Sequence, residues 1–168
     1  MARSIELYLV RHAIAAERGP NYPDDRKRPL TPEGIARFKR TVQGLSRYGV
    51  TLDLVITSPL LRASQTAELL VAGIGGKPRL ETLDALAPGG RMTVVLEALG
   101  MYARRARQLA LVGHEPDMGE LAARLLRARG TIEFKKGAVC CLLLDAAAPT
   151  GPGTLKWLLP PRVLRKLR

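Results

Sequence analysis

The chain contains only two histidines, and each follows a short apolar run that is typical of a buried strand. His12 comes directly after Arg11 in LYLVRH, and His114 ends the apolar run of LVGHEP. A third run leads into TSPLLRASQT, which supplies Ser58 and Arg62. A nearby guanidinium disfavours protonation of an imidazole, so a neutral and nucleophilic histidine is expected here. Together these residue types indicate a phosphoryl-binding site with a histidine nucleophile.

These residues are expected to meet at one edge of a sheet. Open sheets with crossover helices bind ligands beyond the carboxyl ends of their strands, where helix N-termini point into one crevice. Arg62 lies four residues after Ser58, the expected N-cap, and helical side chains slant back toward the N-terminus. We therefore expect two guanidinium groups and two imidazoles to converge on a dianionic phosphoryl group. One histidine would attack phosphorus, and the other side chains would stabilise the charge.

The elements that must position these residues alternate along the chain. Short apolar segments run into helix-like stretches, the pattern of a sheet built with crossover helices. The expected strands are 5–10, 52–57, 79–83 and 108–113, and the expected helices are 32–48, 58–72, 91–100 and 114–130. Two further strand-like runs, 138–145 and 154–159, are separated by a turn and predict an edge hairpin. The predicted fold is an α/β three-layer sandwich with a mostly parallel central sheet, helices on both faces and a C-terminal antiparallel hairpin.

Length and composition predict one domain. The 168 residues are 46% hydrophobic and 25% charged, which fits a single core over 1–168 with a basic tail at 160–168. The N-terminus lacks the apolar region of a signal peptide, and no run is long enough for a membrane span, so a cytoplasmic protein is expected. Cys140 and Cys141 are adjacent in an apolar run, which favours two core residues over a disulfide or a metal site. No metal or other cofactor is predicted.

The charge of the chain is strongly positive. Twenty-seven Lys and Arg against 15 Asp and Glu give a net charge of +12, which attracts nucleic acid, acidic proteins or phosphorylated small molecules. Aromatic residues make up only 4% and no RNA-binding motif is present, which argues against nucleic acid. The tail could contact a polyanion, but a solvated tail is preferred for its cations, Arg162, Arg165, Lys166 and Arg168. A non-catalytic module that binds anions or nucleic acid remains the rival from another class.

The motifs LYLVRH, RPLTPEG, VITSPLLRASQT and LVGHEP resemble, in order and spacing, the histidine phosphatase superfamily, the phosphoglycerate mutase-like group. The resemblance covers nearly the whole chain. It implies that His12 accepts the phosphoryl group, that Arg11 and Arg62 bind phosphate, and that His114 is the second histidine of the pocket. Ser58 would donate its hydroxyl or cap its helix, and the cap is preferred. The short length and the lack of a large inserted cap resemble the small phosphohistidine phosphatase branch rather than the mutases.

Two features depart from that pattern. Ala13 replaces the usual glycine after RH, and its narrower range of backbone conformations predicts a stiffer loop. Many members protonate the leaving group with a carboxylic acid, and here Glu81, Asp84 and Glu115 are candidates without a clear match. Glu115 stands at a helix start, where a carboxylate also stabilises the helix dipole.

The unassigned acid favours one kind of substrate. An alkoxide leaving group needs a proton donor, whereas the imidazole of phosphohistidine carries its own proton away. The prediction is a metal-independent phosphatase that forms a covalent phosphohistidine intermediate and acts on phosphohistidine in a protein, for example a phosphotransfer domain. Within the enzyme class, the alternative substrate is a small phosphomonoester or a nucleotide. Oligomeric state is not predicted by the sequence.

Overall fold

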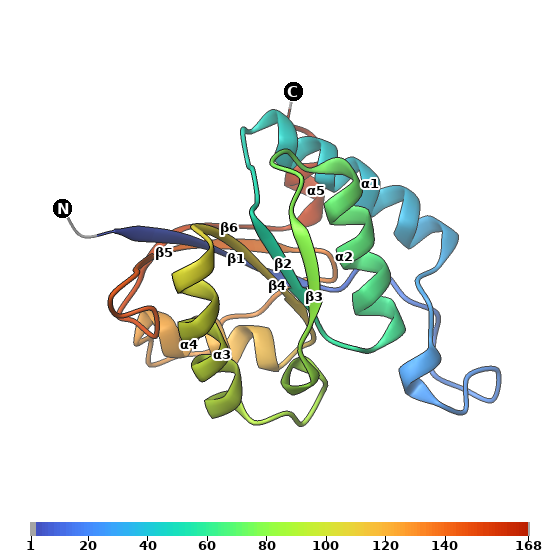
Figure 1. Ribbon diagram of the computed structural model, residues 1–168. Helices are drawn as coiled ribbons and strands as arrows, with labels where there is room; N and C mark the ends of the chain where they lie inside the picture. The colour runs from blue at the N-terminus through green and yellow to red at the C-terminus, as the bar shows by residue number, and fades with distance from the viewer. Residues whose placement is uncertain (1–2, 168) are drawn as a thin grey trace.

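A six-stranded mixed sheet forms the centre of the molecule in the computed structural model, which describes residues 3–167. The strand order is β3-β2-β4-β1-β5-β6. The first four strands of this order run parallel, β5 is antiparallel to β1, and β6 is antiparallel to β5 (Figure 1). The strands are β1 Ser4–Arg11, β2 Leu54–Thr57, β3 Arg79–Thr82, β4 Gln108–Gly113, β5 Val139–Asp145 and β6 Thr154–Leu159. The predicted α/β class and terminal hairpin are confirmed.

Helices cover both faces of this sheet. They are α1 Pro32–Arg47, α2 Leu61–Gly73, α3 Met92–Arg105, α4 Asp117–Leu126 and α5 Pro161–Leu164, with 3-10 turns η1 Asp25–Lys27 and η2 Asp84–Leu86. One apolar cluster joins α3 and α4 to the sheet, and a second joins α1, α2 and α5 to its other face. The result is the predicted three-layer sandwich.

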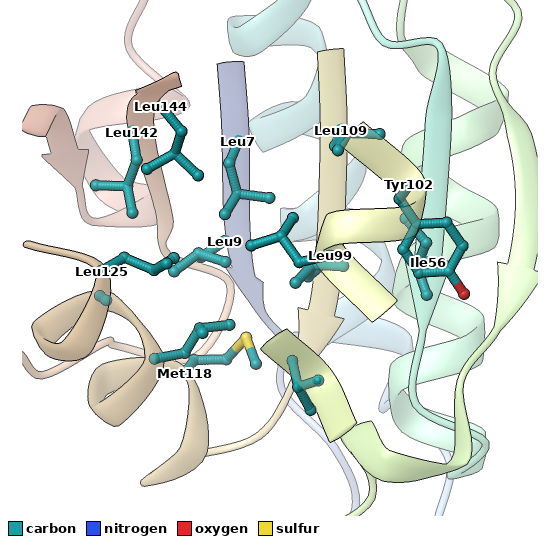
Figure 2. Close-up of a cluster of buried hydrophobic side chains, with 14 of the residues drawn as sticks. Leu7, Leu9, Ile56, Leu99, Tyr102, Leu109, Met118, Leu125, Leu142 and Leu144 are labelled. Atoms are coloured by element: carbon teal, nitrogen blue, oxygen red, sulfur yellow. The ribbon is translucent and has the colours of Figure 1, made fainter. Parts of the chain in front are cut away.

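The alternation of side chains along β1 explains the two cores. Leu7 and Leu9 are fully buried against α3 and α4, whereas Tyr8 and Val10 belong to the cluster under α1 and α2. Figure 2 shows Leu7 and Leu9 among the side chains of the first cluster. Successive residues of a strand face opposite sides of a sheet, so a strand buried on both sides must be apolar throughout. The run LYLV meets that requirement.

The N-termini of α1 and α2 differ in how they are capped. Thr31 caps α1 as predicted, because its hydroxyl accepts a hydrogen bond from the Gly34 N–H at 2.9 Å. The prediction that Ser58 caps α2 is wrong: the helix begins at Leu61, and Leu60 is its N-cap. Ser58 instead continues the strand direction of β2, since its N–H donates to the Val112 carbonyl at 3.0 Å.

Two helix ends and the C-terminus also differ from the expectations. Helix α3 continues to residue 105, and α4 ends at residue 126 because Arg127 adopts a left-handed conformation. The segment expected as a solvated basic tail is folded in part: α5 packs on α1 through the buried Leu164, whereas Arg162 and Lys166 are exposed as expected. Gly44 permits this contact, since a Cβ there would collide with the Leu164 carbonyl. Residue 168 lies outside the described residues.

No helix within residues 3–167 is both long and apolar enough to cross a membrane.

Candidate active site

The register of the parallel strands brings the two histidines together. Arg11 of β1 pairs with Gly113 of β4, so His12 and His114 are the next residues of adjacent strands. The His12 N–H donates to the Gly113 carbonyl at 3.0 Å. The rings of His12 and His114 lie 5.2 Å apart between centroids, at 53° to each other. Both side chains are buried, at 6% and 2% exposure, at the carboxyl edge of the sheet.

A cavity of about 360 Å³ opens at this edge. Five of the residues singled out in the sequence line it, namely Arg11, His12, Arg62, His114 and Glu115. Ser58 is fully buried and contacts the cavity through His114, whose Nε2 lies 2.7 Å from the Ser58 Oγ. The structure therefore gathers in one place residues that are up to about 100 positions apart in the chain.

The tautomer of His12 follows from its contact with the next residue. Nδ1 lies 2.7 Å from the Ala13 carbonyl oxygen. A carbonyl only accepts, so Nδ1 carries the proton and Nε2 keeps its lone pair. The Ala13 N–H donates to the Thr66 hydroxyl at 3.0 Å, which holds this loop in place. Ala13 has no positive φ, so alanine fits this position without backbone strain.

His114 has one ring nitrogen in contact with Ser58 and one that is buried without a partner among the described residues. The Ser58 Oγ accepts a hydrogen bond from the Leu60 N–H at 3.3 Å and lies 2.7 Å from the His114 Nε2, to which its hydroxyl can donate. In that arrangement the proton of His114 is on Nδ1. This nitrogen is buried and has no hydrogen-bond partner among the described residues. Ser58 thus orients a histidine rather than a helix.

Arg11 and Arg62, the two arginines predicted to bind phosphate, each have a donor without a partner among the described residues. Arg11 donates from Nη1 to the Phe134 carbonyl at 2.6 Å, and Arg62 donates from Nη1 to the Asp25 carbonyl at 2.9 Å. The Nε of each is buried and has no partner within residues 3–167. Buried donors without partners are rare in native proteins, and a bound anion is one way to satisfy them.

Arg28 also lines the cavity, although it was not predicted from the sequence as a site residue. Its side chain is 8% exposed, and its Nη1 donates to the Ala16 carbonyl at 2.7 Å. Arg28 is the first residue of RPLTPEG, a motif that was noted without assigning a role to its arginine. The position of Arg28 in this motif could have indicated that it lies at the site.

Asp25 was missed as well, and it contacts three arginines. Its Oδ1 lies 3.0 Å from the Arg28 Nε and 3.2 Å from the Arg18 Nε, and its Oδ2 lies 3.0 Å from the Arg62 Nη2. Burial raises the pKa of Asp25, but the hydrogen bonds and charges of Arg28 and Arg62 outweigh it and hold the pKa below its ordinary value. Nothing in the polar loop around η1 distinguished this aspartate from its neighbours.

Both imidazoles are neutral near pH 7. Burial is the main cause that lowers the pKa of His12 from 6.5 to about 4; the hydrogen bond to Ala13 opposes it, and the charges of the nearby arginines add to it. Burial likewise lowers the pKa of His114 to about 3, with His12 and Arg62 as further causes. From the sequence, only the arginine charges were expected to lower these pKa values, whereas loss of water on burial is the larger effect.

None of the three candidate acids presents a free carboxyl group to the cavity. Glu115 lines it, but its two oxygens accept from the Gly119 N–H at 2.9 Å and the Phe134 N–H at 2.6 Å. Glu81 binds Arg105 at 2.6 Å, and neither Glu81 nor Asp84 is among the residues that line the cavity. Within residues 3–167, no cluster of three or more His, Cys, Asp or Glu side chains could hold a metal ion.

Comparisons with known proteins agree with this arrangement. The histidine phosphatase superfamily (branch 1) matches residues 7–88. The chain is 27% identical to phosphohistidine phosphatase SixA of Escherichia coli over 158 residues, 94% of each chain, and 40% identical to an uncharacterized protein of Picosynechococcus sp. over 145 residues, 80% of this chain and 87% of that one. A structure of the protein histidine phosphatase SixA complexed with tungstate superposes with a TM-score of 0.85 and 27% identity, over 95% of this chain and 99% of that one. The chain belongs to branch 1 of the histidine phosphatase superfamily.

Proposed function

We propose that this protein is a phosphatase that forms a covalent intermediate on His12 and removes the phosphoryl group of phosphohistidine in a protein. The observation that carries the proposal is the state of His12. Its ring is neutral, Nδ1–H is fixed on the Ala13 carbonyl, and Nε2 is left with its lone pair in a cavity lined by arginines. This is the arrangement that nucleophilic attack on phosphorus needs.

In the first step, Nε2 of His12 attacks phosphorus and the P–N bond of the substrate breaks. The guanidinium groups of Arg11, Arg28 and Arg62 stabilise the charge on the equatorial oxygens. A substrate phosphohistidine that is protonated on its other ring nitrogen leaves as a neutral imidazole. His12 already carries a proton on Nδ1, so the phosphoryl group moves between two equivalent rings without any proton transfer.

In the second step, water attacks phospho-His12 and releases dihydrogen phosphate. The leaving group is again an imidazole with its proton on Nδ1, so no acid is required. Both P–N cleavages therefore work in a site where Glu115 is held by two backbone donors and the other candidates lie elsewhere. Cleavage of a phosphomonoester would instead release an alkoxide and would need an acid.

The relatives support the same substrate class. The Escherichia coli relative is named as a phosphohistidine phosphatase, and SixA has been solved with tungstate, a tetrahedral oxyanion. The cavity in this chain offers such an anion two unpaired arginine donors and the Nδ1 of His114.

The test compares the wild-type protein with His12→Ala on a phosphohistidine peptide and on a panel of phosphomonoesters. We expect phosphate release from the peptide, an acid-labile phosphoenzyme in the wild type, and neither in the variant. Release by His12→Ala at the wild-type rate would refute the nucleophile. Faster turnover of a phosphomonoester than of the peptide would refute the substrate class, and binding of an oligonucleotide without any turnover would favour the non-catalytic alternative.

A further inference from the structure

A second cavity, larger than the active site, adjoins it. Its volume is about 650 Å³, and its lining includes Ala13 and Ile14, the residues that follow His12. Lys136 lines both cavities. The second cavity therefore neighbours the first one along the chain segment that carries His12.

The lining of this second cavity combines an apolar floor with a basic rim. Ile14, Ala138, Pro160 and Pro161 contribute apolar surface around the buried Phe38. The rim carries cations from α1, from the loop before β5 and from α5. We call this site the basic cavity and define it by Arg37, Lys135, Lys136, Arg162 and Arg165.

Few acidic side chains balance the positive charge of these cations. Glu133 is the one acidic residue that lines the basic cavity, and Glu33 pairs with Arg37 from the same helix. Burial and the nearby charges of Arg37 and Arg40 lower the pKa of Arg165. Cations held this close repel one another, and an anionic ligand would relieve that repulsion.

We propose that the basic cavity docks an acidic segment of the phosphorylated protein, so that the enzyme selects its substrate by carboxylates that lie near the phosphohistidine. This inference rests on the proposed function and adds a recognition element to it. It also gives a role to the basic C-terminal segment, which the phosphoryl site does not use. Arg162 and Arg165 are placed on the rim because α5 folds back onto α1.

The chemistry of the floor favours a polypeptide as the occupant. Protein interfaces combine an apolar centre with a charged rim, and complementary charge sets specificity and association rate. Single-stranded nucleic acid is instead held by exposed aromatic platforms. The aromatic ring of this cavity, Phe38, is 2% exposed and offers no face for stacking. A volume of about 650 Å³ accommodates a few side chains of a docked segment.

The test uses two phosphohistidine peptides that differ only in flanking residues, acidic in one and neutral in the other. The variant is Lys135→Glu combined with Arg162→Glu, at two exposed positions of the rim. The matched control is Arg79→Glu combined with Arg107→Glu. It makes the same charge change at the amino ends of β3 and β4, at the opposite end of the strands from the site. We expect the wild type and the control to prefer the acidic peptide about tenfold or more in kcat/KM, and the variant to lose this preference through a higher KM. An equal rate on both peptides in the wild type, or an equal loss in the control, would overturn the proposal.

A binding measurement separates this inference from the proposed function. An unphosphorylated acidic peptide is titrated into each protein at low salt and followed by fluorescence anisotropy. Binding that is lost in the rim variant and retained in the control supports the docking site, even if no phosphohistidine is hydrolysed. Absence of binding in the wild type, or tighter binding of a single-stranded oligonucleotide at the same rim, would overturn it.

Discussion

We expect Asp25 to compete with the phosphoryl group for the arginines that we propose to bind it. Its carboxylate accepts from Arg62 and Arg28, and its main-chain carbonyl accepts a further hydrogen bond from Arg62. Asp25 takes one N–H donor on each terminal nitrogen of Arg62, so a dianion bound by the remaining donors shares this guanidinium with a carboxylate that repels it. Asp25→Asn removes the negative charge and keeps the size of the side chain. We expect this variant to bind phosphate and tungstate more tightly than the wild type.

The size of the effect follows from the contacts. A hydrogen bond to a charged partner contributes about 1.5–3 kcal/mol and a neutral one about 1 kcal/mol, so the charge of Asp25 adds about 1 kcal/mol per arginine. Asp25 is 38% exposed, and solvent screening reduces the total for Arg28 and Arg62 to about 1–2 kcal/mol. This corresponds to an affinity for the anion that is higher by about 5- to 30-fold.

The assay measures competitive inhibition by tungstate and by inorganic phosphate. Asp24→Asn is the matched control, because Asp24 is the adjacent residue and its carboxylate accepts from the Arg26 N–H instead of from a cavity arginine. We expect a lower inhibition constant for Asp25→Asn and no change for the control. The thermal stability of Asp25→Asn without ligand should fall, since two buried guanidinium groups lose a charged partner. Weaker inhibition in Asp25→Asn would refute competition and would show that Asp25 orients Arg62 for the phosphoryl group.

Three further predictions concern the histidines and Glu115. The pKa values of His12 and His114 lie near 4 and 3 in the folded state, against 6.5 in the unfolded chain, so the unfolded state binds more protons between these values. The free energy of unfolding should therefore fall by a few kcal/mol as pH drops from 6.5 toward 4. Urea denaturation measures this fall, which should be smaller in His12→Asn. Ser58→Ala should lower kcat/KM about tenfold without loss of helix content by circular dichroism, since Ser58 contacts His114 and does not cap α2; a drop in helicity would contradict this. Glu115→Gln should lower the free energy of unfolding by about 1–3 kcal/mol, because the carboxylate accepts two backbone hydrogen bonds. It should slow hydrolysis of phosphohistidine and of phosphomonoesters equally. A selective loss of activity on the phosphomonoester would identify Glu115 as a general acid.

The sequence predicted the sheet and the gathering of its loops for a clear physical reason. Buried parallel strands are continuous apolar runs, and the residues that follow them must lie at one edge. That reasoning was enough to place Arg11, His12 and His114 in one crevice. The reasoning did not use the pairing register of β1 and β4, although this register places the His12 and His114 rings 5.2 Å apart.

What the sequence could not predict depends on contacts between distant segments. Arg28 lines the cavity, and Asp25 reaches Arg28 and Arg62, because the loop that follows β1 packs against α2. Loop conformation is set by such tertiary contacts rather than by local propensity. Serine is a common N-cap residue, yet the N–H of Ser58 donates to β4 as a continuation of the strand pairing, and α2 begins only at Leu61. The tail was basic enough to suggest solvation, while the burial of Leu164 decided its structure.

One hydroxyl group links the two halves of the phosphoryl site. Thr66 lies one turn after Arg62 on α2, and its Oγ1 donates to the Arg62 carbonyl at 2.7 Å. The same oxygen accepts from the Ala13 N–H, next to the carbonyl that fixes the tautomer of His12. Thr66 is the last residue of RASQT, so the motif that supplies Arg62, the proposed phosphate-binding arginine, also supplies the group that holds the loop after His12, the proposed nucleophile. The spacing of four residues fits helix geometry, because residues three or four apart lie on the same face and a threonine hydroxyl reaches the carbonyl four residues before it.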